Sequence, residues 1–277
     1  MKKIIVPVDF SKHSEDALKT AAFIAKKQNA EIIAVHMLEL SNAIISQSES
    51  YSQQEAVFYL KLAEKKFIEF LNKEYLKEIK VTPIIKHYKI FSELNALAKE
   101  ENAELIVMGS HGIGGLKEIF VGSNTEKVVR NSSVPVLVTK DTPILSNLEN
   151  AVFACDFTNE DIKPYQEAKK LLSKLGCKLH LLHVNTPYGR FKSTKETQKK
   201  VVNFLTKANE TLETLHQVQH ISDYTVESGI LEYANQHNMD LIVIATHGRK
   251  GLSHFFEGSI SEDIANHANL PVMTFKI

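Results

Sequence analysis

Short runs of apolar, often β-branched residues alternate along the chain with segments whose apolar residues recur at helical spacing. Residues 4–8 form a run of the first kind and predict a buried strand. Alanine and leucine then recur at helical spacing, which predicts a helix that Ser11 or Ser14 caps. The same alternation predicts further strands at 32–37, 81–87, 105–108 and 136–138, and helices at 53–77, 91–100 and 123–130.

The whole pattern occurs twice. Residues 5–11 match residues 152–158, an offset of 147, whereas residues 105–112 match residues 241–248, an offset of 136. The offsets differ by 11, so the first copy carries 11 extra residues between positions 40 and 100. A repeat of this kind indicates two copies of one structural unit. We expect a first domain at 1–140, a linker at 141–150 and a second domain at 151–277.

Strands that alternate with helices favour parallel strands, right-handed crossovers and helices on both faces of a sheet. Each copy therefore predicts a small α/β domain, doubly wound, with a five-stranded parallel sheet. We expect the two fifth strands to pair within one chain near Val136 and Val272, with Pro135 and Pro271 at the start of the ladder. A homodimer would then use another surface. Residues 41–52 contain five serines and no helical pattern, so we expect a mobile loop there.

Composition narrows the class of protein. The chain has 277 residues, of which 43% are hydrophobic and 24% charged, as in soluble globular proteins of two domains. No apolar run reaches the ~18–20 residues of a membrane helix, and the first residues lack a signal-peptide pattern, so we expect a cytoplasmic protein. Basic and acidic residues balance at 33 each, which does not favour nucleic-acid binding. Cys155 and Cys177 alone do not suggest a disulfide framework or structural zinc site.

Residues that could contact a ligand follow the ends of the predicted strands. Ligands of open α/β sheets bind beyond the carboxyl ends of the strands, where the strand order reverses. Asp9 follows the first strand and Met37 ends the second. From the residues alone, Asp9 is as good a candidate for a helix N-cap as for a ligand contact.

Glycines follow the fourth strand in a spaced pattern. Gly109 and Gly112 are followed, nine residues later, by Gly122 and Ser123. Ser123 with Glu126 has the spacing of a capping box, and free N–H groups at a helix start favour an anion such as phosphate. The same glycines without a ligand would form only a tight corner between strand, loop and helix. The pattern is neither the Walker motif nor the dinucleotide fingerprint.

In these motifs the sequence resembles a tandem universal stress protein of the ATP-binding type. The resemblance rests on the glycine pattern at 109–123, on Pro-Val-Asp-Phe-Ser at 7–11, on His36 at the end of the second strand, and on Val-Pro-Val-Leu-Val at 134–138. It implies Rossmann-like domains of the adenine nucleotide alpha hydrolase-like kind. It also implies a nucleotide-dependent regulatory module in the stress response, a binder with at most slow ATP hydrolysis and no catalytic residues of its own.

The resemblance further implies a site for ATP, ADP or AMP, with Mg²⁺ or Mn²⁺ held by phosphate oxygens and water and not by the protein. A second, weaker site is expected because Ala245 replaces the first glycine and would be strained where φ is positive. The implied first site comprises Pro7, Val8, Asp9, Met37, Met108, Gly109, His111, Gly112, Gly122, Ser123 and Asn124. The implied second site comprises Asp156, Val184, Gly248, Gly258 and Ser259.

Two other functions stay open. One is an enzyme of the adenine-nucleotide α-hydrolase type, although its Ser-Gly-Gly-x-Asp-Ser and His-x-Gly-His motifs do not occur in the sequence. The other is a scaffold that binds nothing and recruits a protein partner. The histidines favour neither, because each has an ordinary structural interpretation. We expect a satisfied structural role for His36 and His183 at the ends of buried strands, loop-ordering hydrogen bonds from His111 and His247, and an exposed helix end for His216 and His220.

Overall fold

The computed structural model describes residues 1–38, 49–87, 90–110, 123–187, 191–246, 264 and 268–277. Within these residues the chain divides into two compact units, of which unit 1 ends at Leu145 and unit 2 begins at Ser146. Both have the expected α/β architecture. No helix in the described part of the chain combines the length and the apolar character needed to cross a membrane.

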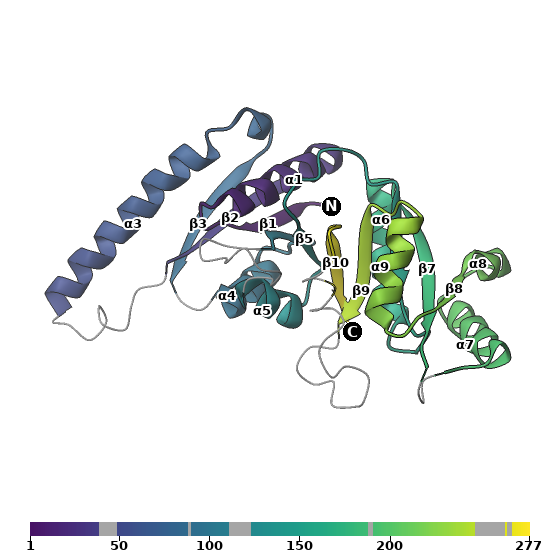
Figure 1. Cartoon of the computed structure of the whole chain (residues 1–277). Helices are drawn as coiled ribbons and strands as arrows, with labels where there is room; N and C mark the ends of the chain where they lie inside the picture. The colour runs from purple at the N-terminus through teal and green to yellow at the C-terminus, as the bar shows by residue number, and fades with distance from the viewer. Residues whose placement is uncertain (39–48, 88–89, 111–122, 188–190, 247–263, 265–267) are drawn as a thin grey trace. The chain divides into compact units, whose positions relative to one another are not determined.

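Unit 1 alternates strands and helices, as Figure 1 shows in purple to teal. The order is β1 (Lys3–Pro7), α1 (Lys12–Gln28), β2 (Glu31–Leu38), α3 (Glu49–Leu71), the 3-10 helix η1 (Glu74–Leu76), β3 (Val81–His87), α4 (Ile90–Glu100), β4 (Leu105–Gly109), α5 (Ser123–Asn131) and β5 (Val136–Thr139).

The strands of unit 1 lie in the order β3-β2-β1-β4-β5, and all of these neighbours pair in parallel. Ile4 of β1 is in register with Ile32 on one side and with Leu105 on the other. The chain fills the sheet from β1 outward to β3 and then returns to the other side of β1. The strand order therefore reverses between β1 and β4, which is where open α/β sheets bind ligands.

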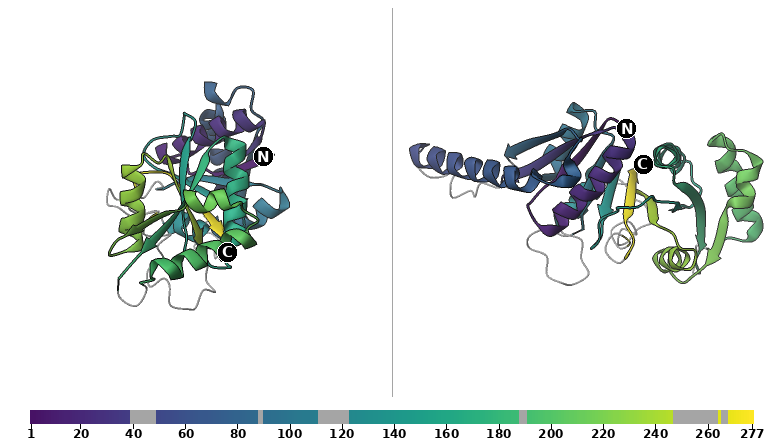
Figure 2. Two further views of the ribbon diagram at one scale, coloured as in Figure 1. Left: turned by 90° about the vertical axis from the view of Figure 1, so that its right-hand side faces the viewer. Right: turned by 90° about the horizontal axis from the view of Figure 1, so that it is seen from above.

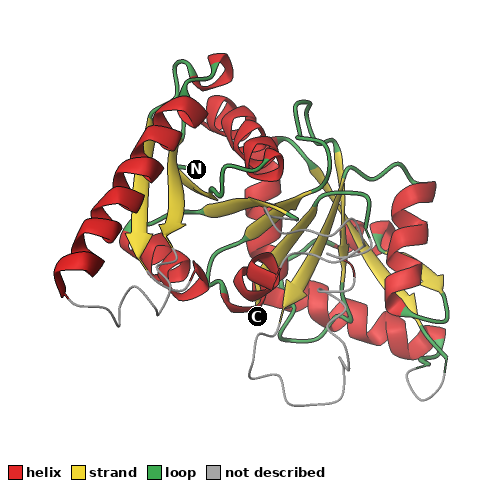
Figure 3. Ribbon diagram, turned by 60° about the vertical axis from the view of Figure 1, so that its left-hand side comes forward, coloured by secondary structure: helices red, strands yellow, loops and turns green. Residues whose placement is uncertain are grey.

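Helices cover both faces of this sheet (Figure 3). Ile5, Ile33 and Ile106 point to one face, where they pack with Leu94 of α4 and Val128 of α5. Because side chains alternate along a strand, the neighbouring residues point to the opposite face, which α1 and the carboxyl-terminal half of α3 cover. The helix predicted after the first strand is α1, and its alanines and leucine at 17, 18, 21, 22 and 25 are all buried.

Unit 2 repeats the arrangement, with strand order β8-β7-β6-β9-β10 and parallel pairing throughout (Figure 2). One face of its sheet packs against α9 through Val152, Leu182 and Ile242. The elements are β6 (Asn150–Ala154), α6 (Ile162–Leu175), β7 (Lys178–Asn185), α7 (Thr194–Lys207), α8 (Leu212–Gln217), β8 (Gln219–Ser222), α9 (Val226–Gln236), β9 (Leu241–Thr246) and β10 (Val272–Lys276).

The second helix of unit 1 differs from the sequence-based expectation at both ends. It begins at Glu49, so residues 49–52 of the expected serine-rich loop are helical; residues 41–48 lie outside the described part. It ends at Leu71 and not near residue 77, because the Lys73 N–H donates to the Leu71 carbonyl and turns the chain before η1. Serine and glutamine in its first turns carry no apolar periodicity, which hid the true start.

Pro135 and Pro271 come directly before β5 and β10. The carbonyls of Pro135 and Pro271 accept hydrogen bonds from the N–H groups of Ile106 and Ile242, at the first step of β5 and β10. A residue without an N–H fits such a place. The prolines are predicted at the start of the ladder between the two fifth strands, and that expectation stays a prediction. Pairing of the fifth strands with each other stays a prediction.

Candidate functional site

Val8 takes the chain out of the central strand of unit 1. Its N–H donates to the Val35 carbonyl at 2.7 Å, and its own carbonyl lies 2.7 Å from Nδ1 of His36. A carbonyl only accepts, so Nδ1 carries the proton and the expected structural role of His36 is confirmed. Burial lowers the pKa of His36, and the charge of Lys66 adds to this, whereas the Val8 hydrogen bond and the charge of Asp9 oppose it.

Asp9 orders the turn between β1 and α1. Its Oδ1 accepts from the N–H of Ser11 at 3.0 Å and from the Ser11 hydroxyl at 2.6 Å. Ser11 is the N-cap of α1, and its Oγ accepts from the N–H of Ser14 at 3.2 Å. The N-cap role therefore belongs to Ser11, and Asp9 holds the cap in place from two residues upstream.

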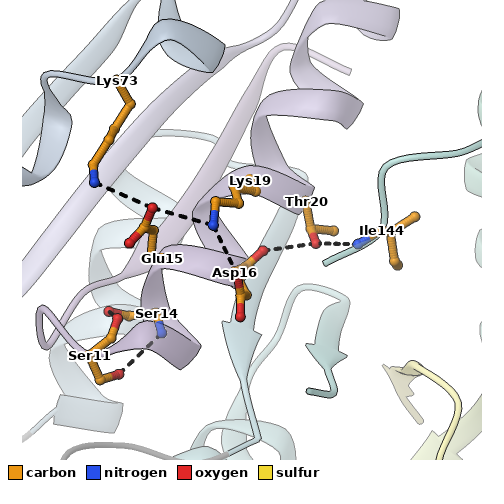
Figure 4. A network of polar contacts seen from close by, with 8 residues as sticks. All are labelled: Ser11, Ser14, Glu15, Asp16, Lys19, Thr20, Lys73 and Ile144. Atoms are coloured by element: carbon orange, nitrogen blue, oxygen red, sulfur yellow. Dashed lines mark hydrogen bonds and ion pairs between the residues drawn. The ribbon is translucent and has the colours of Figure 1, made fainter. Parts of the chain in front are cut away.

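The first turns of α1 are also fixed by a network of charges, drawn in Figure 4. Glu15 lies 3.3 Å from the ammonium groups of both Lys19 and Lys73, and Lys19 also reaches buried Asp16 at 3.2 Å. Burial opposes ionisation of Glu15, but the two lysines outweigh it and lower the pKa of this carboxyl. The network ties the start of α1, and with it the Asp9 turn, to the segment after α3.

Phe10 has an unusual backbone conformation at this edge, which no pattern in the sequence marks. Its φ of 65° lies in the left-handed region, which non-glycine residues seldom adopt. Its ring lies 4.6 Å from the ring of His36 and 5.2 Å from that of Phe67, and the ammonium of Lys66 is 5.7 Å from its centroid. Left-handed non-glycine residues cluster at functional sites.

The same conformation recurs in unit 2. Phe157 has a φ of 56°, and its ring lies 5.9 Å from His183 and 5.2 Å from Phe204. Phe10 and Phe157 are partners in the repeat at the offset of 147, so the repeat marked this pair although nothing in it marked the backbone angle.

Gly109 ends β4 on the other side of the strand-order reversal. A Cβ placed on it would lie 2.9 Å from the carbonyl oxygen and 3.0 Å from Cβ of His13, in the first turn of α1. Among the described glycines only Gly176 has a positive φ, so the strain expected where φ is positive does not apply at Gly109. Close approach of α1 requires glycine here. In unit 2, α6 begins only at Ile162, three residues later in the repeat, which explains why Ala245 is tolerated.

The start of α5 is fastened to the end of β4. The hydroxyl of buried Thr125 donates to the Gly109 carbonyl at 3.0 Å. The helix begins at Ser123, as predicted, and Asn124 lies exposed in its first turn. Glu126 pairs with Arg130 at 3.2 Å. The N-terminal turn of α5 is thereby held next to the strand-order reversal, with its N–H groups at the carboxyl edge.

Several of the sequence-predicted residues of the first site thus meet at one edge of unit 1. Those in described positions are Pro7, Val8 and Asp9 at the end of β1, Met37 in β2, Met108 and Gly109 at the end of β4, and Asn124 in α5. His111, Gly112, Gly122 and the side chain of Ser123 lie outside the described residues.

In unit 2 the corresponding edge is built differently. The Asp156 carbonyl accepts from the ammonium of Lys200 at 3.4 Å. Val184 is buried, and its Cγ1 would lie 2.7 Å from a Cβ on Gly229 of α9, so it faces the core and offers the edge only its backbone. Gly248, Gly258, Ser259 and His247 lie outside the described residues.

The expected exposed helix end is confirmed for His216 and wrong for His220, because the two histidines lie in different elements. His216 lies in α8, whereas His220 lies in β8, in register with His183 and 5.8 Å from its ring. No group of three or more histidine, cysteine, aspartate or glutamate residues in the described ranges is arranged to hold a metal ion. Cys155 and Cys177 are both free thiols.

Comparison with known proteins assigns the chain to a family. The model of the Universal stress protein family matches residues 1–140 and again residues 147–276. The chain belongs to the universal stress protein family. It carries the family's domain twice, in tandem, and each copy has a Rossmann-like α/β fold.

Related proteins match one half of the chain or the whole of it. Universal stress protein MJ0577 of Methanocaldococcus jannaschii is 34% identical over 154 residues, which cover 50% of this chain and 94% of that protein. YxiE of Bacillus subtilis is 30% identical over 152 residues, which cover 50% and 98%. A universal stress protein from Archaeoglobus fulgidus has a similar structure, with a TM-score of 0.67 over 99% of this chain and 96% of that chain at 23% identity. At this identity the last similarity shows the fold alone.

Proposed function

We propose that unit 1 binds an adenine nucleotide at the carboxyl edge of its sheet and that the protein acts as a nucleotide-dependent regulatory module in the stress response. The proposal rests on the hydrogen bond that joins α5 to β4. The Thr125 hydroxyl donates to the Gly109 carbonyl and so holds the first turn of α5 beside the strand-order reversal. Helix N-termini in this position favour phosphate groups. The family's glycine pattern supports the same ligand.

Each part of the proposed site has a role in this binding. The turn held by Asp9 and Ser11 faces the adenosine end, Met37, Met108 and Gly109 line the path along the edge, and the start of α5 takes the phosphates. A divalent ion would be held by phosphate oxygens and water, since the described residues supply no group of carboxylates for it. We propose ATP as the first ligand to test, with ADP and AMP beside it.

Titration calorimetry of the full chain tests the proposal. We expect ATP to bind, and we expect Gly122→Val to lose most of the affinity because a branched side chain blocks the approach of phosphate to the backbone. Nucleotide extraction from the freshly purified protein gives an independent readout. Undiminished ATP binding by Gly122→Val would show that the site is assigned wrongly.

Two substitutions of Asp9 separate its structural role from a ligand contact. Asp9→Asn keeps an oxygen that accepts from Ser11 but removes the charge, whereas Asp9→Ala removes both. If the carboxylate contacts the nucleotide, both variants lose affinity. If Asp9 only orders the turn, only Asp9→Ala does, and its melting temperature falls with the affinity.

We propose that unit 2 binds nucleotide more weakly than unit 1. Lys200 contacts the turn after β6 and α6 starts three residues late, so its edge departs from that of unit 1. Calorimetry is then expected to give one tight site per chain. A tight site that survives Gly122→Val and disappears on Gly258→Val would reverse the assignment.

Enzymatic and scaffold functions are the competing proposals, and the same purified protein distinguishes them. Release of AMP and pyrophosphate, or sustained turnover of ATP, would favour an enzyme of the α-hydrolase type. Absence of bound and bindable nucleotide would favour a scaffold for a protein partner. We also propose that β5 and β10 pair within one chain; a Val136→Cys, Val272→Cys double variant that forms no intramolecular disulfide would contradict this.

A further inference from the structure

The outer face of α3 exposes large apolar side chains among charged ones. Val57 is 51% exposed and Ile68 is 73% exposed, on a helix whose buried face carries Ala63, Phe67 and Phe70. In Figures 1 and 2 the amino-terminal half of α3 extends beyond the strands of its own unit. Phe58 and Leu62 of the same helix are also exposed, at 62% and 39%. Several large apolar side chains exposed on one helix are typical of a surface that contacts a partner.

The charges on this face identify the kind of partner. Val57, Lys61, Glu64 and Ile68 follow one another at spacings of four, three and four, so they form one stripe along about 16 Å of helix. All four are exposed. Read from either end, the stripe has an apolar residue, a charge, the opposite charge and an apolar residue. It is therefore complementary to its own reversed copy.

The positions of unit 2 that correspond to this stripe differ in their burial. Phe67 and Phe204 occupy equivalent places, since each packs on the left-handed phenylalanine of its unit. On this alignment Glu64 and Ile68 correspond to Val201 and Leu205 of α7, which are 0% and 4% exposed. Helix α8 packs against α7. Unit 2 therefore buries the two positions that correspond to Glu64 and Ile68. The other two positions of the stripe correspond to Thr194 and Gln198, which are exposed in unit 2 as well.

We infer that α3 is the contact surface for a second copy of this chain, which packs antiparallel along it about a two-fold axis between Lys61 and Glu64. Val57 then meets Ile68 of the second copy, and Lys61 meets its Glu64; each contact occurs twice, as an isologous interface requires. One helix face is smaller than the about 800 Å² per partner of a standard stable interface. The dimer is therefore expected to dissociate on dilution.

Sedimentation velocity of the full chain over a range of concentrations, without nucleotide, tests the interface. The single variants Lys61→Glu and Glu64→Lys each place like charges opposite one another twice, so each is expected to raise the dimer dissociation constant about tenfold or more. The double variant Lys61→Glu, Glu64→Lys restores opposite charges and is expected to restore dimerisation. Lys170→Glu, an exposed reversal on α6, is the matched control and is expected to change nothing.

Cross-linking tests the antiparallel register directly. A Val57→Cys, Ile68→Cys double variant is expected to form a disulfide-linked dimer under mild oxidation, and Ile68→Cys alone is not, because the axis keeps the two copies of position 68 apart. Circular dichroism checks that α3 remains helical in every variant. A wild-type chain that stays monomeric at all concentrations, or a dimer that neither charge reversal weakens and the double variant does not cross-link, would overturn the inference.

Discussion

At the residue scale, single backbone positions decide how the chain leaves the sheet. Phe10 and Phe157 turn the chain through the left-handed region after the central strand, at a cost of order 1 kcal/mol each. Their rings offset that cost by packing on a histidine of the next strand and on a phenylalanine of the helix that follows that strand. The motif Asp-Phe-Ser and its partner Asp-Phe-Thr were visible in the sequence as a repeat, but a phenylalanine gives no sign of a positive φ.

The close contact between Gly109 and α1 predicts that a larger residue at this position destabilises the fold. Gly109→Ala is expected to lower the free energy of unfolding by about 1–3 kcal/mol, because the added methyl group overlaps the His13 backbone. Urea denaturation of the full chain measures the change. The reverse replacement in unit 2, Ala245→Gly, is the matched control and is expected to cost no more than about 1 kcal/mol. A neutral or stabilising Gly109→Ala would show that α1 does not press on this residue.

At the element scale, the strands and the first helix follow closely from their patterns, and the second helix does not. β3 begins and ends where it was predicted, and α5 begins at Ser123 as expected. Continuous β-branched runs and clear capping residues make such elements readable. α3 was misplaced at both ends because its first turns are polar and its end depends on a turn at Lys73.

The repeat also locates the extra residues of unit 1. The strand-one phenylalanines differ by 147 positions, whereas Phe67 and Phe204 differ by 137. Ten of the 11 extra residues therefore lie before Phe67. α3 has 23 residues and α7 has 14, so much of the addition lengthens this helix at its beginning. The sequence alone showed that the extra residues lie between positions 40 and 100. It did not show which element contains them, because this requires knowing which side chains of the two units are structurally equivalent.

The N-cap of α1 is expected to contribute to the stability of the protein. Ser11→Ala is expected to lower the free energy of unfolding by about 1 kcal/mol, because it removes the cap of α1 and a partner of Asp9. Ser11→Asn, which retains a capping oxygen, is expected to lose little. Thermal and urea unfolding measure both. An alanine variant as stable as the wild type would show that the charge network of α1 suffices without the cap.

At the scale of the whole molecule, the sequence predicted two doubly wound units and the general place of the site. It did so because strand–helix alternation and a repeat leave few other topologies. It missed the reason for Gly109, which depends on how closely α1 approaches β4. It also missed the separation of His216 and His220 into different elements, because the polar segment between them has no periodicity that marks the boundary of α8.

Four histidines whose pKa is lowered predict the response of the molecule to acid. Burial is the main cause that lowers the pKa of His36 in unit 1 and of His180, His183 and His220 in unit 2. As the pH falls through the ordinary histidine value of 6.5, the unfolded chain takes up these protons before the folded chain does. The neutral histidines therefore contribute to the free energy of unfolding above pH 6.5. This contribution is lost as the pH falls towards their lower pKa values in the folded chain.

Thermal unfolding followed at pH 7.5 and pH 5.5 measures this loss. The melting temperature is expected to fall by about 2–4 °C for each kcal/mol of stability lost. His183→Gln removes one of the titrating groups, so its fall between the two pH values is expected to be smaller than that of the wild type. An equal fall in both proteins would show that His183 titrates alike in the folded and unfolded chains.

The long second helix of unit 1 has a consequence for the local opening of the fold. Within the part of α3 whose side chains the structure describes, the turns around Ala63, Phe67 and Phe70 pack on the core, while Val57 and Phe58 lie mostly in solvent. Amide protons along this one helix should therefore exchange with deuterium at graded rates, fast near Val57 by fraying and slow near Phe70 by opening of the core. A second copy on the outer face would slow amide exchange first near Val57, where exchange is fast. Measuring exchange rates along α3 at increasing protein concentration would therefore follow the association turn by turn.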